Sequence, residues 1–344
     1  MSDVKKKLSV KQKILVAVFG FLGLILFVLG GLIAFLRLSV IDYYIASERT
    51  FRIPDIGKGI VPQGFDYDKK NDYFLVSGYM KDNSPARLYL VDRKTGENLK
   101  YVTLLDNDGN DYTGHFGGVA LYNNLIYVAH ETSILVYSYK DILSAKSQDK
   151  IKQRGEINTK ISDTDYVTNS FVSVYGNKLI AGEFCDEPKY ITLDTHKITT
   201  PSGDKNEAIM LEYDLHPQYP LGTNGIPRRA YSITGKVQGT CFTNDKIYLS
   251  TSYGMSFSHI KEYDINSLTK TGDGVFLGLP VPIYSLDSSS MTYDYEIAPM
   301  SEEIIMLDDE LYTMCESAST KYIFGNLTAS QWCYKTDLEK MRKQ

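Results

Sequence analysis

Two histidines, several carboxyl groups and three side-chain amides recur at corresponding points of a repeated sequence unit. Carboxyl groups and imidazoles can act as general acids and bases, and carboxylate and amide oxygens can bind a cation or a polar ligand. The candidate ligand-binding residues are Gln63, His115, His130, Glu131, Asn169, Glu183, Gln238, Glu302 and Glu316. The sequence has no motif typical of α/β-hydrolases, zinc proteases or phosphate-binding loops. Any chemistry therefore depends on a fold that gathers these side chains.

Four of these residues suggest calcium as a cofactor. Glu302 facing Glu183 across a channel would supply carboxylates, and Asn169 and Gln238 would add amide oxygens. The acidic segment Asp106–Asp111 also resembles a calcium-binding loop, but its glycine stands at the fourth place instead of the sixth. We interpret that segment as a turn.

A unit of two short apolar strands joined by a polar turn recurs five times and must position these side chains. The units start near residues 63, 117, 170, 238 and 302, so the period is 53 to 68 residues. The strands are rich in Val, Ile, Tyr and Thr, and the turns contain Asn, Asp and Gly. Such a period is typical of the blades of a β-propeller, so we predict an all-β fold over residues 45–337.

Five units predict five blades, with two alternatives left open. A sixth blade could lie in the weaker stretch Ile265–Tyr295, and the architecture could instead be an irregular β-sandwich. The last unit lacks an outer strand, which Arg49–Ile53 could supply to close the ring. In a blade, the first strand starts and the second strand ends at the same face of the disc. The candidate residues should therefore converge at the mouth of the channel, where Tyr79 and Tyr253 could stack on a sugar ring.

An uncharged apolar run from Ile14 to Leu36 precedes the repeats. As a helix it would be roughly 34 Å long, enough to cross a bilayer core of about 30 Å. The run is longer than the apolar region of a cleaved signal peptide, so we expect a transmembrane anchor at residues 14–36. Because five lysines lie within residues 1–13, we expect a cytoplasmic tail and an extracytoplasmic propeller in the cell membrane.

The net charge argues against one class of partner, and the cysteine spacing argues against a zinc site. The chain has a net charge of −5, and because residues 1–37 carry +5, residues 38–344 carry −10. Such an acidic body does not suit nucleic acid. The cysteines Cys185, Cys241, Cys315 and Cys333 have no zinc-site spacing. Since an exported domain permits disulfides, a Cys315–Cys333 bridge across adjacent strands is one hypothesis, and free buried thiols are the other.

The first residues of the repeated units resemble those of a known group of proteins. Pro62-Gln63-Gly64-Phe65, His115-Phe116-Gly117-Gly118-Val119 and Met300-Ser301-Glu302-Glu303-Ile304 resemble those of exported, membrane-anchored bacterial β-propeller proteins of uncharacterised function. Through Gln63-Gly64 the chain is also faintly similar to five-bladed glutaminyl cyclases. The resemblance covers residues 60–335 and implies a fold and a bacterial cell-envelope location without a reaction.

The sequence thus predicts a single-pass, membrane-anchored propeller that binds a ligand or protein partner at its channel face. The expected partners are the membrane, an envelope protein, or a cell-wall glycan or peptide. One alternative is an envelope hydrolase or glutaminyl-cyclase-like enzyme that uses carboxyl groups and His130 at the same mouth. A second is an assembly scaffold that uses the rim of the disc.

Overall fold

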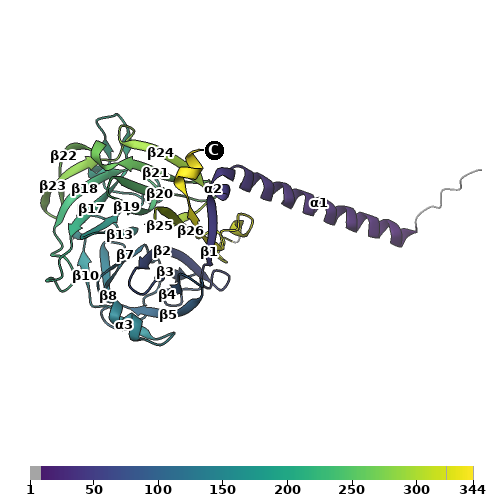
Figure 1. Cartoon of the computed structure of the whole chain (residues 1–344), viewed down its shortest axis with the longest axis horizontal. Coiled ribbons are helices and arrows are strands. Elements are labelled where there is room, and N and C mark those ends of the chain that lie inside the picture. The colour runs from purple at the N-terminus through teal and green to yellow at the C-terminus, as the bar shows by residue number, and fades with distance from the viewer. Residues whose placement is uncertain (1–8, 323, 344) are drawn as a thin grey trace, which may run out of the picture.

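The computed structural model, which describes residues 9–322 and 324–343, arranges five radial β-sheets around a central channel (Figure 1). Each sheet is one blade, so the predicted five-bladed β-propeller is confirmed. The repeated sequence unit forms the two inner strands of every blade. Its turns favour hairpins: Asp308 and Asp309 have φ angles of 54° and 62°, as a type I′ turn requires.

The blades follow one another along the chain, and each consists of strands arranged from the channel outward. Blade 1 contains β2 (Ile60–Asp68), β3 (Tyr73–Met80), β4 (Arg87–Asp92), β5 (Asn98–Leu105) and β9 (Lys150–Lys152). Blade 2 contains β6 (Val119–Tyr122), β7 (Leu125–His130), β8 (Ser133–Ser138) and β10 (Gly155–Asn158). Blade 3 contains β13 (Phe171–Tyr175), β14 (Lys178–Gly182), β17 (Ala208–Asp214) and β18 (Pro227–Ile233). Blade 4 contains β19 (Val237–Phe242), β20 (Lys246–Thr251), β21 (Ser258–Asp264) and β24 (Met291–Ile297).

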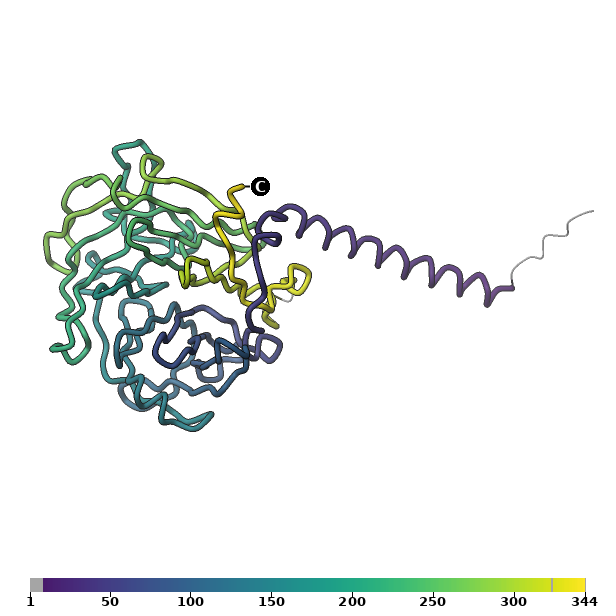
Figure 2. Tube along the Cα trace, viewed as in Figure 1, coloured from purple at the N-terminus to yellow at the C-terminus, as the bar shows by residue number. Residues whose placement is uncertain are grey.

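Blade 5 combines strands from both ends of the chain. It contains β25 (Ser301–Leu307), β26 (Glu310–Cys315), β27 (Trp332–Thr336) and, outermost, β1 (Ser47–Arg52). Strand β1 pairs antiparallel with β27, with Ser47 opposite Thr336. Figure 2 shows this early segment, in purple, beside the last strand in yellow. The prediction that an N-terminal strand closes the ring is confirmed.

The stretch Ile265–Tyr295 does not form a sixth blade. It contains the hairpin β22 (Thr269–Phe276) and β23 (Leu279–Ser285), which leaves blade 4 and adds to the outer edge of blade 3. Strand β23 pairs parallel with β18, and the chain then returns as β24 to complete blade 4. The connecting loops hold short elements: α3 (Tyr139–Ser144), β11 (Lys160–Ser162), β12 (Asp165–Tyr166), η1 (Asp194–His196), β15 (Ile198–Thr199), β16 (Lys205–Asn206), η2 (Ile265–Ser267) and η3 (Phe324–Asn326).

Five apolar cores fill the spaces between neighbouring blades. Around the channel the inner strands β2, β6, β13, β19 and β25 contact one another in ring order. Glycine allows this approach, because a Cβ on Gly118 would lie 2.1 Å from Glu303 Oε2 and 2.7 Å from the Val172 backbone nitrogen. A Cβ on Gly239 would likewise lie 2.5 Å from the Glu303 Cα.

All four cysteines are buried free thiols, so the hypothesis of a Cys315–Cys333 bridge is wrong. Thr313 lies opposite Tyr334 in the β26–β27 pair, which places Cys315 and Cys333 on opposite faces of blade 5. Cys315 accordingly packs in the core between blades 4 and 5, and Cys333 in the core between blades 5 and 1.

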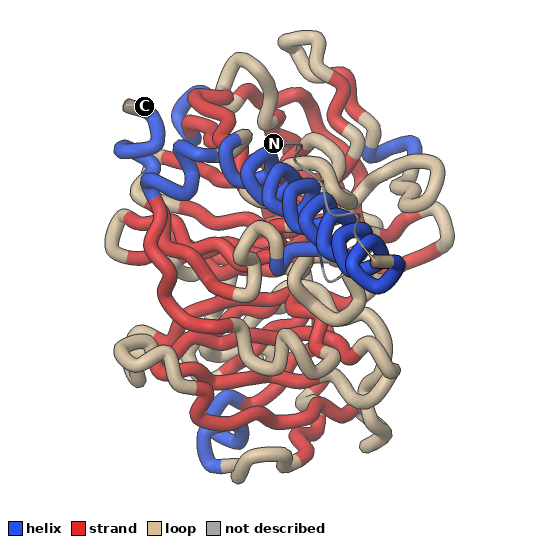
Figure 3. The backbone as a smooth tube through the Cα atoms, turned by 90° about the vertical axis from the view of Figure 1, so that its right-hand side faces the viewer, coloured by secondary structure: helices blue, strands red, loops and turns tan. Residues whose placement is uncertain are grey.

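The helix α1 (Val10–Leu38) begins with a capping box in which the Ser9 side chain and the Gln12 side chain each accept a backbone N–H of the other residue. It projects from the rim of the propeller beside blade 5, and Figure 3 shows it in front of the strands. Among the described residues it is the one helix long and apolar enough to cross a membrane, a test that a signal sequence also passes. Lys5, Lys6 and Lys7 of the predicted cytoplasmic tail lie outside the described residues.

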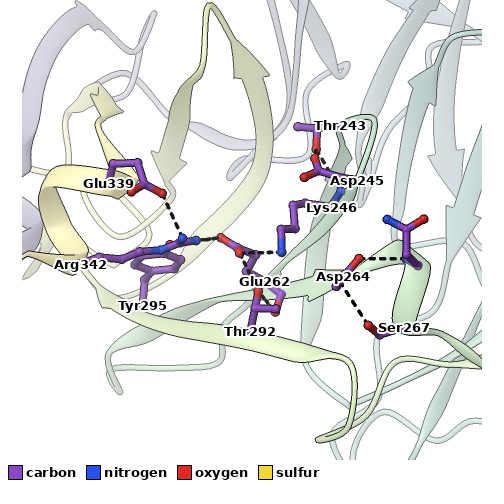
Figure 4. Close-up of polar contacts among 11 residues, drawn as sticks. Thr243, Asp245, Lys246, Glu262, Asp264, Ser267, Thr292, Tyr295, Glu339 and Arg342 are labelled. Atoms are coloured by element: carbon purple, nitrogen blue, oxygen red, sulfur yellow. Dashed lines mark hydrogen bonds and ion pairs between the residues drawn. The ribbon is translucent and has the colours of Figure 1, made fainter.

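Two short helices hold the ends of the chain against the rim. The helices α2 (Ile41–Ala46) and α4 (Leu338–Arg342) pack together over the core between blades 4 and 5. Figure 4 shows how α4 is held: the Arg342 guanidinium donates to the buried carboxylate of Glu262 on β21. That carboxylate also accepts from Thr292 Oγ1 at 2.6 Å and from the Tyr295 hydroxyl at 3.1 Å.

Candidate functional site

A cavity of about 740 Å³ opens at one end of the channel, and every blade contributes to its wall. We call it the channel-mouth cavity. As the strand directions predict, its wall combines the starts of first strands with the ends of second strands. Of the predicted site residues it includes Gln63, His115, His130, Glu131, Asn169, Gln238 and Glu316. Tyr79 and Tyr253 also line it. That any of these residues binds a ligand stays a prediction.

Glu183 is outside this wall because its side chain turns into blade 3. It is completely buried, and its two carboxylate oxygens lie 3.0 and 2.9 Å from His196 Nδ1. A carboxylate facing Nδ1 makes that nitrogen the donor. Glu183 also accepts the backbone N–H of Ile209 at 3.0 Å. Its hydrogen bonds are thus made within the fold, and it does not face Glu302 across the channel.

Glu302 is also buried away from the cavity wall, next to Glu316. Burial raises the pKa of Glu302 well above its usual range, and the neighbouring charges of Glu316 and Glu303 raise it further. Gln238 Nε2 lies 3.5 Å from its carboxyl oxygen. Glu302 is therefore harder to ionise than an exposed carboxyl group, and it is not among the residues that line the cavity.

Glu316 is the carboxyl group that the cavity itself presents. Gln63 Nε2 donates to its Oε2 at 3.0 Å. Burial raises the pKa of Glu316 to about 7, while the positive charge of Lys321 and hydrogen bonds from Tyr322 and Gln63 partly offset that rise. A carboxyl group that exchanges its proton near pH 7 is suited to acid–base chemistry and to hydrogen bonding in either protonation state.

Sequence reasoning missed Lys321 and Tyr322, which lie in the loop between β26 and β27. Lys321 Nζ donates to the Tyr79 hydroxyl at 2.6 Å and lies 5.0 Å from the ring centroids of both Tyr79 and Tyr322. The loop follows Glu316 directly, so its position at the predicted mouth was the signal that could have identified them.

The two predicted histidines lie side by side in the wall and have different roles. The carbonyl oxygen of His115 can only accept, so the His130 Nδ1 at 3.1 Å carries the hydrogen. This leaves Nε2 of a neutral His130 as the basic nitrogen. Burial, together with the charges of Lys321 and His130, lowers the pKa of His115 to about 4. His115 is therefore neutral at pH 7, with its ring 5.0 Å from that of Tyr79.

Three further aromatic side chains line the cavity from blades 3 and 4, and of these the sequence indicated only Tyr253. Phe184 and Tyr190 come from the long connection after β14, and Tyr253 follows β20. Their ring centroids are 5.2, 5.9 and 6.0 Å apart. Lys189 Nζ lies 4.8 Å from the Tyr190 centroid.

Of the four residues considered for calcium, Asn169 and Gln238 line the cavity, whereas Glu183 and Glu302 do not. Within residues 9–322 and 324–343, no three His, Cys, Asp or Glu side chains are grouped so that they could hold a metal ion. In the acidic segment Asp106–Asp111, the Asp106 carboxylate accepts the backbone N–H groups of Asp108 and Asn110. The segment is therefore a turn closed by its own hydrogen bonds, in agreement with the interpretation from the sequence.

No protein-family model and no curated protein matches this chain. Among solved structures, it is similar to a glutaminyl cyclase of Myxococcus xanthus, at 8% identity over 84% of this chain and 94% of that chain, with a TM-score of 0.41. It is similar to the tail fibre of Staphylococcus aureus phage P68, at 9% identity over 86% of this chain and 54% of that chain (TM-score 0.46). BamB from Moraxella catarrhalis is 8% identical over 75% of this chain and 82% of that chain (TM-score 0.33).

Proposed function

We propose that this chain is a membrane-anchored, extracytoplasmic β-propeller that binds a small envelope ligand in the channel-mouth cavity. The observation that carries the proposal is the cavity of about 740 Å³ to which all five blades contribute. Its size is that of a small-molecule site, and such sites combine apolar walls with a few convergent polar groups. Cell-wall glycans and peptides are the ligands expected for a protein in this location.

Thermal unfolding of the full chain in detergent tests ligand binding. The melting temperature is measured with a panel of cell-wall saccharides, peptides and their fragments. A compound that binds only the folded protein at a hundredfold excess over Kd stabilises it by about 2.7 kcal/mol. We expect at least one compound to raise the melting temperature of the wild type and not that of Glu316→Gln. No shift with any compound would overturn the proposal and favour a scaffold that uses the rim.

The anchoring and its orientation are part of the proposal. The support is the apolar helix α1 and the lysines that precede and begin it, because basic residues flank the cytoplasmic ends of transmembrane helices. The test uses a membrane-impermeant maleimide on intact cells, with the four native thiols buried and unreactive. Lys58→Cys, at a side chain 79% exposed, should be labelled in intact cells. Lys11→Cys should be labelled only after the cells are permeabilised, and the reverse pattern would overturn the orientation.

A second candidate function is a hydrolase or cyclase working in the same cavity. It is favoured by Glu316, whose pKa of about 7 suits proton transfer, and by the basic Nε2 of His130. An enzyme would lose turnover in Glu316→Gln at a temperature and pH at which the variant is fully folded. A binding protein would lose affinity and convert none of the panel compounds.

A further inference from the structure

The channel-mouth cavity is lined by two chemically different sets of residues. One is the aromatic wall, formed by Phe184, Tyr190 and Tyr253. Tyr190 is 41% exposed and Tyr253 37%, although both are large rings at the cavity. The other is the polar wall, with the amides Gln63, Asn169 and Gln238 and the acid Glu316. A ligand that fills this cavity needs an apolar face together with hydrogen-bonding groups.

The polar wall contains an acceptor that the fold leaves without a donor. Asn169 is 4% exposed, and its Nδ2 donates to Thr159 Oγ1 at 2.7 Å and to the Glu131 carbonyl at 3.0 Å. Its Oδ1 has no hydrogen-bond partner among the described residues. This oxygen has almost no exposed surface, so the partners that the polar wall offers a ligand are the amide and carboxyl side chains that line the cavity. A hydroxyl group suits such a wall, because it both donates and accepts.

The lysines beside the aromatic rings disfavour a cationic ligand on those rings. Each group of aromatic rings already has a lysine against it: Lys189 lies 4.8 Å from the Tyr190 centroid, and Lys236 lies 5.9 Å from that of Tyr253. Lys321 lies 5.0 Å from the Tyr79 centroid. The faces that could attract an amine are thus shared with protein cations, which would repel it. An anionic group finds the Lys321 ammonium, of whose three donors Tyr79 takes one.

We infer that the channel-mouth cavity binds a sugar that carries a carboxylate. The apolar C–H face of the ring packs on Tyr190 and Tyr253, its hydroxyls meet the side chains of the polar wall, and its carboxylate lies at Lys321. A flat aromatic acid would leave the polar wall without partners, which is costly for buried groups. A neutral sugar would make no use of Lys321. This inference rests on the proposed ligand-binding function and names its ligand class.

The test is calorimetric titration of the full chain in detergent with trigalacturonate and with its trimethyl ester. The two probes share their rings and differ in charge. We expect the acid to bind at least tenfold more tightly than the ester. Lys321→Gln should bring the two affinities within about twofold, and Lys321→Arg should restore the difference. Tyr253→Ala should weaken both probes about tenfold. The controls Lys58→Gln and Tyr219→Ala, at residues that do not line the cavity, should change neither.

The outcomes separate this inference from the proposed function. Equal affinity for acid and ester, or a preference that Lys321→Gln leaves intact, overturns the acidic-sugar inference. The same holds if neither probe binds but a peptide or neutral glycan of the panel stabilises the wild type, in which case the ligand-binding function stands. If neither the probes nor any panel compound binds, both proposals fall. Circular dichroism of each variant verifies that the fold is retained.

Discussion

The ion pair that holds the C-terminal helix gives a prediction whose size follows from the structure. The Glu262 side chain is 1% exposed and Arg342 is 30% exposed. Replacing Arg342 with Met leaves a buried carboxylate without its main cation. Breaking a buried pair costs about 3–5 kcal/mol. The cost is smaller for this pair because Arg342 is partly exposed and Lys246 Nζ stays 3.5 Å from Glu262. We expect a loss of about 2–3 kcal/mol.

The assay is thermal unfolding of the full chain followed by circular dichroism. A loss of that size corresponds to a decrease in the melting temperature of roughly 3–5 °C for a domain of this size. The matched control is Arg228→Met. Arg228 is 67% exposed and pairs with Asp214 at 3.3 Å, so its pair is worth about 0–1 kcal/mol.

The same variant has a defined pH dependence. Burial tends to raise the pKa of Glu262, but the hydrogen bond from Thr292 and the charge of Arg342 outweigh it and hold this pKa below its usual value. A carboxylate with a depressed pKa stabilises the fold above its unfolded pKa of about 4.3, and this stabilisation is lost as the pH falls through the folded pKa. The gap between wild type and Arg342→Met should therefore be full at pH 7 and should narrow below pH 4. A decrease no larger than that of Arg228→Met, or a gap unchanged at low pH, would refute the reasoning.

Three further predictions concern the channel and the thiols. Burial raises the pKa of Glu316 to about 7, so the stabilisation that its protonated form gives is present below about pH 4.3 and is lost as the pH rises through 7. The melting temperature of Glu316→Gln should therefore vary less between pH 5 and 8 than that of the wild type. Equal pH profiles of the two proteins would contradict this. Gly118→Ala should cost about 1–3 kcal/mol by overpacking, whereas Gly57→Ala, where an added Cβ meets nothing within 4 Å, should be close to neutral in the same melts. The four buried thiols should not react with a thiol reagent in the folded protein, and all four should react in denaturant without reductant; two reactive thiols would instead indicate a disulfide.

The inner strands could be predicted because each hairpin is determined by signals within a short stretch of sequence. Apolar strands around turns such as Asp308-Asp309 place β25 and β26 without knowledge of the rest of the chain. The hairpin of β22 and β23 could not be predicted in the same way. Its strand β23 pairs with β18 of blade 3, and the local sequence of Ile265–Tyr295 does not indicate which blade the hairpin will join.

The site was predictable as far as strand ends determine it. Strand direction correctly brought Gln63 and Glu316 to one mouth. It did not determine the direction of each side chain, which alternates along a strand, so Glu302 and Glu183 point away from the cavity. Lys321 and Tyr190 lie in loops, where no periodicity marks a functional side chain.

The pairing of β1 with β27 also determines when the ring can close during synthesis. The Ser47 and Thr336 side chains that meet in this pair are 289 positions apart in the chain. At 5–20 residues per second, β1 emerges from the ribosome roughly 15–60 s before its partner. Throughout that interval β1 is an unpaired edge strand next to the apolar helix α1. Ring closure therefore cannot precede the synthesis of β27, and a chain that stops before Trp332 leaves both β1 and β26 with open edges.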